Sequence, residues 1–260
     1  HAGAFNSLGR ELCGGHLAWL ATHGVVGLSV SYRLTNSPSD GAGVAGAITD
    51  AWTALQWVRA NAARLGINPK KVAVWGDSAG GGMALALATG LRPMLGAAYP
   101  PGALSLAARA DLPTAAIAGY PVVTFGSRSF LMRRDKRRRG GFGRLRGGGP
   151  RWLETSATSD LEVANTFVPD GRGATAAAAR ATLRSTFAGA NLFFGQHRGG
   201  LLLPAAGLYD ELVAASLSPL SLARRRGLPP MLLLSAASDT IVPVGQQEYF
   251  AEESRRGGNS

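Results

Sequence analysis

Apolar residues in the first part of the chain alternate between helical spacing and short continuous runs. Residues 8–23 carry leucines at helical spacing up to Gly24, and the next run, 25–32, is rich in β-branched residues, as in a buried strand. Residues 46–65 place Ile48, Trp52, Leu55 and Val58 on one helical face. This predicts a helix, a strand and a second helix.

The same alternation continues around the middle and near the end of the chain. Residues 72–75 form a short apolar run, and 79–90 is a helical stretch entered through glycines. Further strands are expected at 114–120 and 231–236, and a helix at 245–254. Strands that alternate with helices at this spacing predict an α/β fold whose mostly parallel sheet is covered by helices on both faces.

The stretch between 121 and 229 interrupts this rhythm. We interpret residues 126–205 as an insertion or cap within one domain that spans 1–260. Ala-rich sequence suggests helices near 174–188 and 207–216.

Composition and charge narrow the classes of function. Hydrophobic residues make up 46% of the 260, which suits a globular core, and no apolar run approaches the roughly 18 residues of a membrane span. The net charge is +11, but segment 128–151 holds ten basic residues and one acidic residue. The basicity is therefore local, and nucleic acid is not the expected partner. A solvated loop is favoured over an anion-binding module. Cys13 is the only cysteine, so no intramolecular disulfide can form and the redox compartment stays open. The oligomeric state is not predicted.

Residues 76–80 carry the strongest chemical signal. Gly76-Asp77-Ser78-Ala79-Gly80 matches G-x-S-x-G and lies between a predicted strand and a predicted helix. A nucleophilic serine there must project from a sharp turn, which leaves room only for small neighbours. The helix that follows directs its N-terminal N–H groups toward developing negative charge. The alternative is a glycine-rich turn of an ordinary α/β protein.

Two further segments, together with the serine turn, resemble the carboxylesterases of the hormone-sensitive-lipase-like and feruloyl-esterase-like family of α/β-hydrolases. Residues 1–5, HAGAF, are similar to the family's H-G-G-[GA]-F loop, with Ala2 where glycine is usual. Residues 239–243, DTIVP, are similar to the loop that carries its catalytic acid. The likeness also includes SVSYRL at 29–34, and it covers roughly 1–125 and 215–255.

The resemblance implies roles for individual residues. Ser78 would be the nucleophile, and Asp239 the acid that orients the catalytic histidine, although Asp239 could instead merely cap a loop. The N–H groups of Gly3, Ala4 and Ala79 would form the oxyanion hole. A structural role falls to three further residues: His1, which would hold the loop, and the motif glycines Gly76 and Gly80.

The chain departs from the family pattern at the catalytic base. Its histidines, His1, His16, His23 and His197, all precede Asp239, whereas the family order is serine, acid, histidine. In the family's sheet, the strand that precedes the first loop lies between the two strands that correspond to 25–32 and 72–75. This central strand has no counterpart in residues 1–260. We therefore expect a gene product that is longer at both ends, and an inactive chain as printed.

These observations predict a serine hydrolase that cleaves carboxylic esters through an acyl-enzyme on Ser78, with no metal or organic cofactor. The expected partner is a small-molecule ester. An amidase, peptidase or lipase on the same scaffold stays open. So does a non-catalytic receptor resembling the plant gibberellin receptors, although intact Ser78 and Asp239 argue against that reading.

Overall fold

The computed structural model describes the chain in several stretches. They are residues 1–3, 5, 8–34, 43–96, 98, 103–124, 132–134, 152–154, 216–236, 239, 242 and 244–259. The expected helix at 174–188 lies outside them, as do nearly all of the helix at 207–216 and most of the insertion 126–205.

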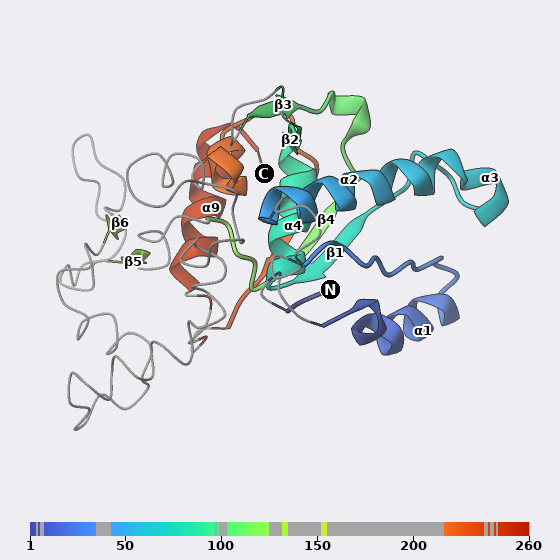
Figure 1. Ribbon diagram of the computed structural model, residues 1–260. Helices are drawn as coiled ribbons and strands as arrows, with labels where there is room; N and C mark the ends of the chain where they lie inside the picture. The colour runs from blue at the N-terminus through green and yellow to red at the C-terminus, as the bar shows by residue number, and fades with distance from the viewer. Residues whose placement is uncertain are drawn as a thin grey trace.

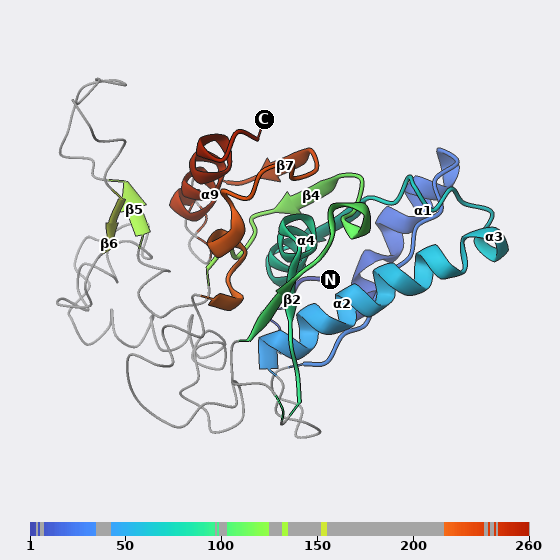
Figure 2. The same ribbon diagram turned by 90° about the horizontal axis from the view of Figure 1, so that it is seen from above.

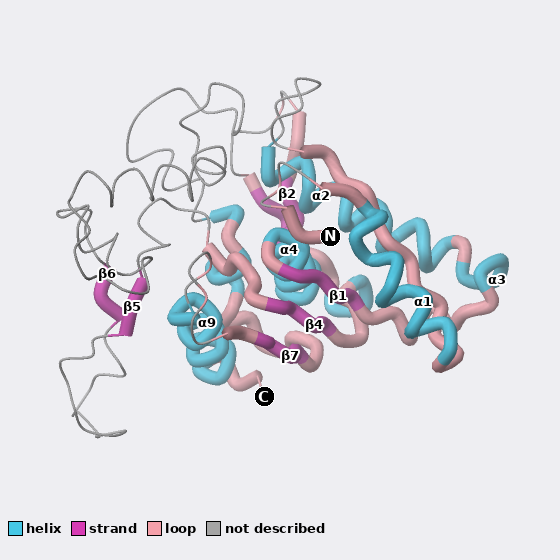
Figure 3. The backbone as a smooth tube through the Cα atoms, turned by 90° about the horizontal axis from the view of Figure 1, so that it is seen from below, coloured by secondary structure: helices cyan, strands magenta, loops and turns pink. Residues whose placement is uncertain are grey.

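Three parallel strands form the central sheet. β1 (Val74–Asp77) pairs with β4 (Ala116–Gly119), and β4 pairs with β7 (Met231–Leu234). They run side by side in Figure 3. β1 begins two residues later than the apolar run predicts, and the parallel arrangement is confirmed.

Helices cover one face of this sheet. α4 (Ala79–Thr89) lies against it, and all of its residues are buried, as expected for a helix that is apolar all round. α2 (Gly43–Ala60) and α9 (Val244–Arg256) flank α4 on opposite sides, as Figures 1 and 2 show. α4 ends where the sequence predicts, at Gly90, whose φ of 79° is left-handed.

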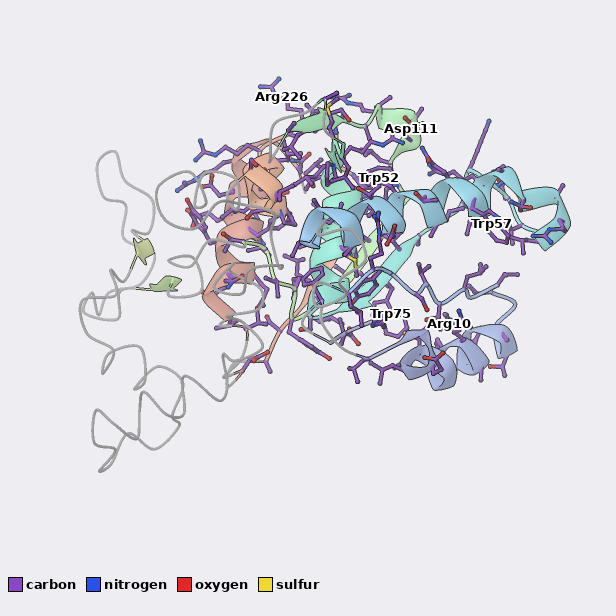
Figure 4. The ribbon with its side chains drawn as sticks, in the orientation of Figure 1. Arg10, Trp52, Trp57, Trp75, Asp111 and Arg226 are labelled. Carbon is purple, nitrogen blue, oxygen red and sulfur yellow. The ribbon has the colours of Figure 1, made fainter. Side chains whose placement is uncertain are left out.

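The predicted face of α2 is the one that is buried. Ile48, Trp52, Leu55 and Val58 are all at most 9% exposed. The indole N–H of Trp52 donates to the carbonyl of Leu91 over 2.7 Å, whereas Trp57, also labelled in Figure 4, is 45% exposed. The helical periodicity of this segment therefore identified the core-facing side correctly.

The remaining elements surround this centre. An antiparallel hairpin of β2 and β3 follows α4 and was not predicted. The bounds are η1 Arg10–Cys13, α1 Gly14–Thr22, α3 Ala62–Leu65, β2 Leu91–Pro93, β3 Leu104–Leu106, η2 Arg109–Asp111, β5 Met132–Arg134, β6 Trp152–Glu154 and η4 Pro219–Leu222. β5 and β6 pair antiparallel at the ends of the Arg-rich segment. No helix in the described stretches is long and apolar enough to cross a membrane.

The prediction of a buried strand at 25–32 is wrong for this structure. No strand is assigned there, and Val25 and Val26 are 47% and 50% exposed. A strand exists only when a neighbour pairs with its backbone, and among the described residues β1 has β4 as its one neighbour in the sheet. The apolar pattern of 25–32 therefore has no ladder to join.

Among the described residues, helices cover the second face of the sheet only in part. Trp75, Ile117, Leu232 and Leu234 point away from α4 and are 36–52% exposed. The ring of His16 on α1 meets Trp75 edge-on at 4.5 Å. In the view of Figure 3, no described helix lies in front of β4 or β7.

Candidate active site

Ser78 occupies a strained turn between β1 and α4. Its backbone has φ 53° and ψ −115°, a conformation that costs a non-glycine residue free energy and that clusters at functional sites. Its N–H donates to the carbonyl of Gly119 over 2.8 Å, which fixes the turn to the end of β4. The side chain is half-buried. This is the sharp bend that G-x-S-x-G predicts.

The two motif glycines allow backbone segments to approach closely. A Cβ atom on Gly76 would collide with the carbonyl group of Gly80, so any side chain there would break the turn. A Cβ atom on Gly80 would lie 2.9 Å from the carbonyl oxygen of His1. Gly80 is therefore the contact between the serine turn and the N-terminal segment, two motifs far apart in the sequence.

The N-terminal segment is held beside the start of α4, where the N-terminus lies in Figures 1 and 3. The ring of His1 stacks on Tyr32, with centroids 4.1 Å apart and an interplanar angle of 15°. Its Nδ1 lies 2.7 Å from the carbonyl of Ala2. These contacts give His1 a structural setting, as the resemblance implies.

The structure describes two of the three expected oxyanion donors, Gly3 and Ala79. Gly3 has a φ of 120°, which favours glycine, and Phe5 is fully buried in the same core as Ala79. Ala79 is the first residue of α4, where N–H groups lack partners within the helix. Ala4 lies outside the described residues, and whether these N–H groups act together stays a prediction.

Asp239 follows β7 at the same edge of the sheet as Ser78. Its Oδ1 accepts a hydrogen bond from the N–H of Val242 over 2.9 Å, and its own N–H donates to Ala236 over 3.2 Å. The loop-capping role considered for Asp239 is therefore present. It does not conflict with a catalytic one, because a carboxylate has two oxygens and several acceptor positions.

Tyr120, at the end of β4, is a residue that sequence reasoning missed. Burial, and then the negative charges of Asp77 and Asp239, raise the pKa of its phenol. Both carboxylates act on the same phenol, so Asp77 and Asp239 lie in one region, near the ends of β1, β4 and β7. Its φ of 34° is also unusual for a non-glycine residue. Its position at a strand end before Pro121 was the signal available in the sequence.

A sequence model of the α/β hydrolase fold family matches residues 1–142, more than half of the chain. The chain belongs to the α/β-hydrolase fold family. This confirms the family and the fold inferred from the motifs.

Individual relatives are esterases. Carboxylesterase NlhH of Mycobacterium tuberculosis is 48% identical over 61 residues, which are 24% of this chain and 18% of NlhH. Native esterase 2 of Thermogutta terrifontis is 24% identical with a TM-score of 0.56, and its butyrate-bound form is 25% identical with a TM-score of 0.55. Each alignment covers 99% of this chain, which spans about two thirds of those structures (65% and 66%).

Proposed function

We propose that this α/β-hydrolase is a serine esterase that cleaves small carboxylic esters. The observation that carries the proposal is the strained turn at Ser78, which is half-buried at the end of a parallel strand, with the backbone of His1 packed on Gly80. The likeness to carboxylesterase NlhH supports an ester substrate.

The reaction would proceed in two steps. The Ser78 hydroxyl attacks the ester carbonyl and passes its proton to an imidazole, and the alcohol leaves with that proton. Water then attacks the acyl-enzyme, and the acid is released. The backbone N–H groups of Ala79 and of Gly3 or Ala4 would stabilise the negative oxygen of each tetrahedral intermediate.

Asp239 would orient the imidazole. Adjacent strands lie about 4.8 Å apart, so the ends of β1 and β7 are separated by roughly 10 Å across β4. An imidazole between the two side chains can fill that span. Val242 holds one oxygen of the carboxylate, which limits rotation of the acid.

The three described histidines do not meet this requirement. His1 is stacked on Tyr32, His16 lies against Trp75 and His23 contacts Trp19. The proposal therefore calls for an imidazole from outside the described residues.

A paired substitution tests the proposal. The protein is expressed with any sequence that flanks residues 1–260 in its gene, and p-nitrophenyl propionate and butyrate are the substrates. These acyl lengths are chosen because esterase 2 of T. terrifontis has been solved with propionate and with butyrate. Ser78→Ala should lower kcat by about 10⁴- to 10⁶-fold, because the acyl-enzyme cannot form.

Ser29→Ala is the matched control. The Ser29 hydroxyl donates to the Arg10 carbonyl on the exposed surface, so its loss should leave the rate unchanged. A folded wild type without esterase activity, or equal rates for wild type and Ser78→Ala, would refute the proposal.

A further inference from the structure

We propose that Tyr32 is a positioning residue for the oxyanion loop, a role that rests on the esterase function proposed above. Tyr32 would act through the backbone of His1 and would not touch the substrate. It would thereby set the rate of acyl transfer more than the affinity for the ester.

Tyr32 contacts His1 in two independent ways. Its hydroxyl donates to the His1 carbonyl over 3.1 Å, and its ring stacks on the imidazole at 4.1 Å. The ring of Phe5 also lies near that of Tyr32, with centroids 6.2 Å apart and the planes tilted by 60°. Tyr32 is only 8% exposed, so it is a fixed part of the core on which the loop rests.

The orientation of the His1 carbonyl determines the direction in which the loop continues. The peptide bond is planar, so fixing the C=O of His1 also fixes the N–H of Ala2 in the same plane. Gly3, an expected oxyanion donor, is the next residue. The same carbonyl lies against Gly80, where a Cβ atom would approach to 2.9 Å. Rotation of this peptide would therefore move the donors relative to Ser78.

The backbone of Tyr32 is itself anchored. The neighbouring Arg33 donates from its backbone N–H to Oδ2 of Asp50 over 2.8 Å, and its guanidinium donates to Oδ1 over 2.9 Å. The guanidinium also reaches the carbonyl of Gly46. A continuous series of contacts thus runs from α2 through residues 33 and 32 to His1 and the first turn of α4.

The hydroxyl of Tyr32 stays a donor throughout the working range of an esterase. Burial raises the pKa of the phenol well above its usual value, so the proton is retained. No change in ionisation of Tyr32 interrupts its hydrogen bond to the loop.

Tyr32→Phe is the test, because it removes the hydroxyl and keeps the stacked ring. In the protein expressed with its flanking sequence, kcat for p-nitrophenyl butyrate should fall about tenfold while KM changes less than twofold. An aryl trifluoromethyl ketone, which forms an oxyanion on the serine, should lose affinity about tenfold in parallel. Tyr249→Phe, which removes a phenol hydroxyl from α9, should leave both quantities unchanged.

The other outcomes are separable. If wild type hydrolyses the ester and Tyr32→Phe has the same kcat and inhibitor affinity, the positioning role is wrong and the esterase function stands. If Tyr32→Phe no longer unfolds cooperatively, Tyr32 supports the whole fold and the role is also wrong. If folded wild type has no activity, both proposals fail together.

Discussion

At the scale of single residues, the site depends on the absence of side chains as much as on their presence. Ser78 can adopt its strained turn because Gly76 and Gly80 leave room on either side. G-x-S-x-G made this part predictable, since the turn itself imposes the small residues. Tyr32 and Tyr120 were not predicted as site residues, because their importance comes from neighbours that are distant in the sequence.

Gly80→Ala tests the close approach of the two motifs. The new Cβ would collide with the His1 carbonyl, and backbone is not free to move as the end of a side chain is. We expect kcat/KM to fall about 100-fold from misplaced donors, with a loss of about 1–3 kcal/mol in unfolding free energy. Ester hydrolysis and urea denaturation measure the two effects.

Gly15→Ala provides the comparison. A Cβ on Gly15 meets nothing within 4 Å, and this residue lies inside α1. It should keep full activity and gain up to about 1 kcal/mol from the helical propensity of alanine. Equal activity of Gly80→Ala and Gly15→Ala would show that the contact with His1 has no role.

At the scale of elements, the ion pair between Arg33 and Asp50 fastens the segment that follows α1 to α2. The guanidinium binds both carboxylate oxygens, and the Arg33 N–H adds a third donor group. The two side chains are 36% and 25% exposed, so water weakens the pair only in part. The ion pair therefore holds the end of segment 25–34 against α2, although this segment pairs with no described strand.

Asp50→Asn should therefore reduce the unfolding free energy by about 1–2 kcal/mol, because charge-assisted hydrogen bonds become neutral or are lost. Thermal or urea unfolding measures this. Glu11→Gln is the matched change at an exposed pair, Arg10–Glu11 at 3.7 Å, and should change stability by less than about 0.5 kcal/mol. A similar small effect for Asp50→Asn would contradict the anchoring role.

Periodicity predicted the helices better than the strands. The buried face of α2 and the glycine that ends α4 were predictable from the sequence, because helical hydrogen bonds are local and apolar residues recur every three to four positions on the buried face. Strands depend on partners elsewhere in the chain. For this reason 25–32 was wrongly expected to be a strand, and the β2–β3 hairpin after Gly90 was missed.

At the scale of the whole molecule, the two faces of the sheet differ. One face packs on α4, where Leu85 is fully buried, and the other exposes Ile117, Leu232 and Leu234. Exposed apolar area of this kind promotes association in solution but contributes little to folding of the chain itself. Sequence alternation marked both sets of positions as apolar and could not tell which face the described helices cover.

The double substitution Leu232→Ser and Leu234→Ser tests this asymmetry. Because both side chains are about half exposed, the expected loss of unfolding free energy is small, below about 1 kcal/mol, and self-association measured by light scattering should decrease. Leu85→Ala, on the covered face, should cost about 2–5 kcal/mol. A larger loss from the double substitution than from Leu85→Ala would contradict the assignment of the two faces.

Covalent labelling of Ser78 measures directly whether this one hydroxyl is activated as a nucleophile. The protein expressed with its flanking sequence is incubated with a fluorophosphonate at neutral pH, and the site is mapped by peptide mass spectrometry. We predict one adduct per chain, on Ser78, with proportional loss of ester hydrolysis and no adduct on the Ser78→Ala variant. An unlabelled Ser78 in a protein that still hydrolyses esters, or an adduct on another serine that abolishes activity, would show that Ser78 is not the nucleophile.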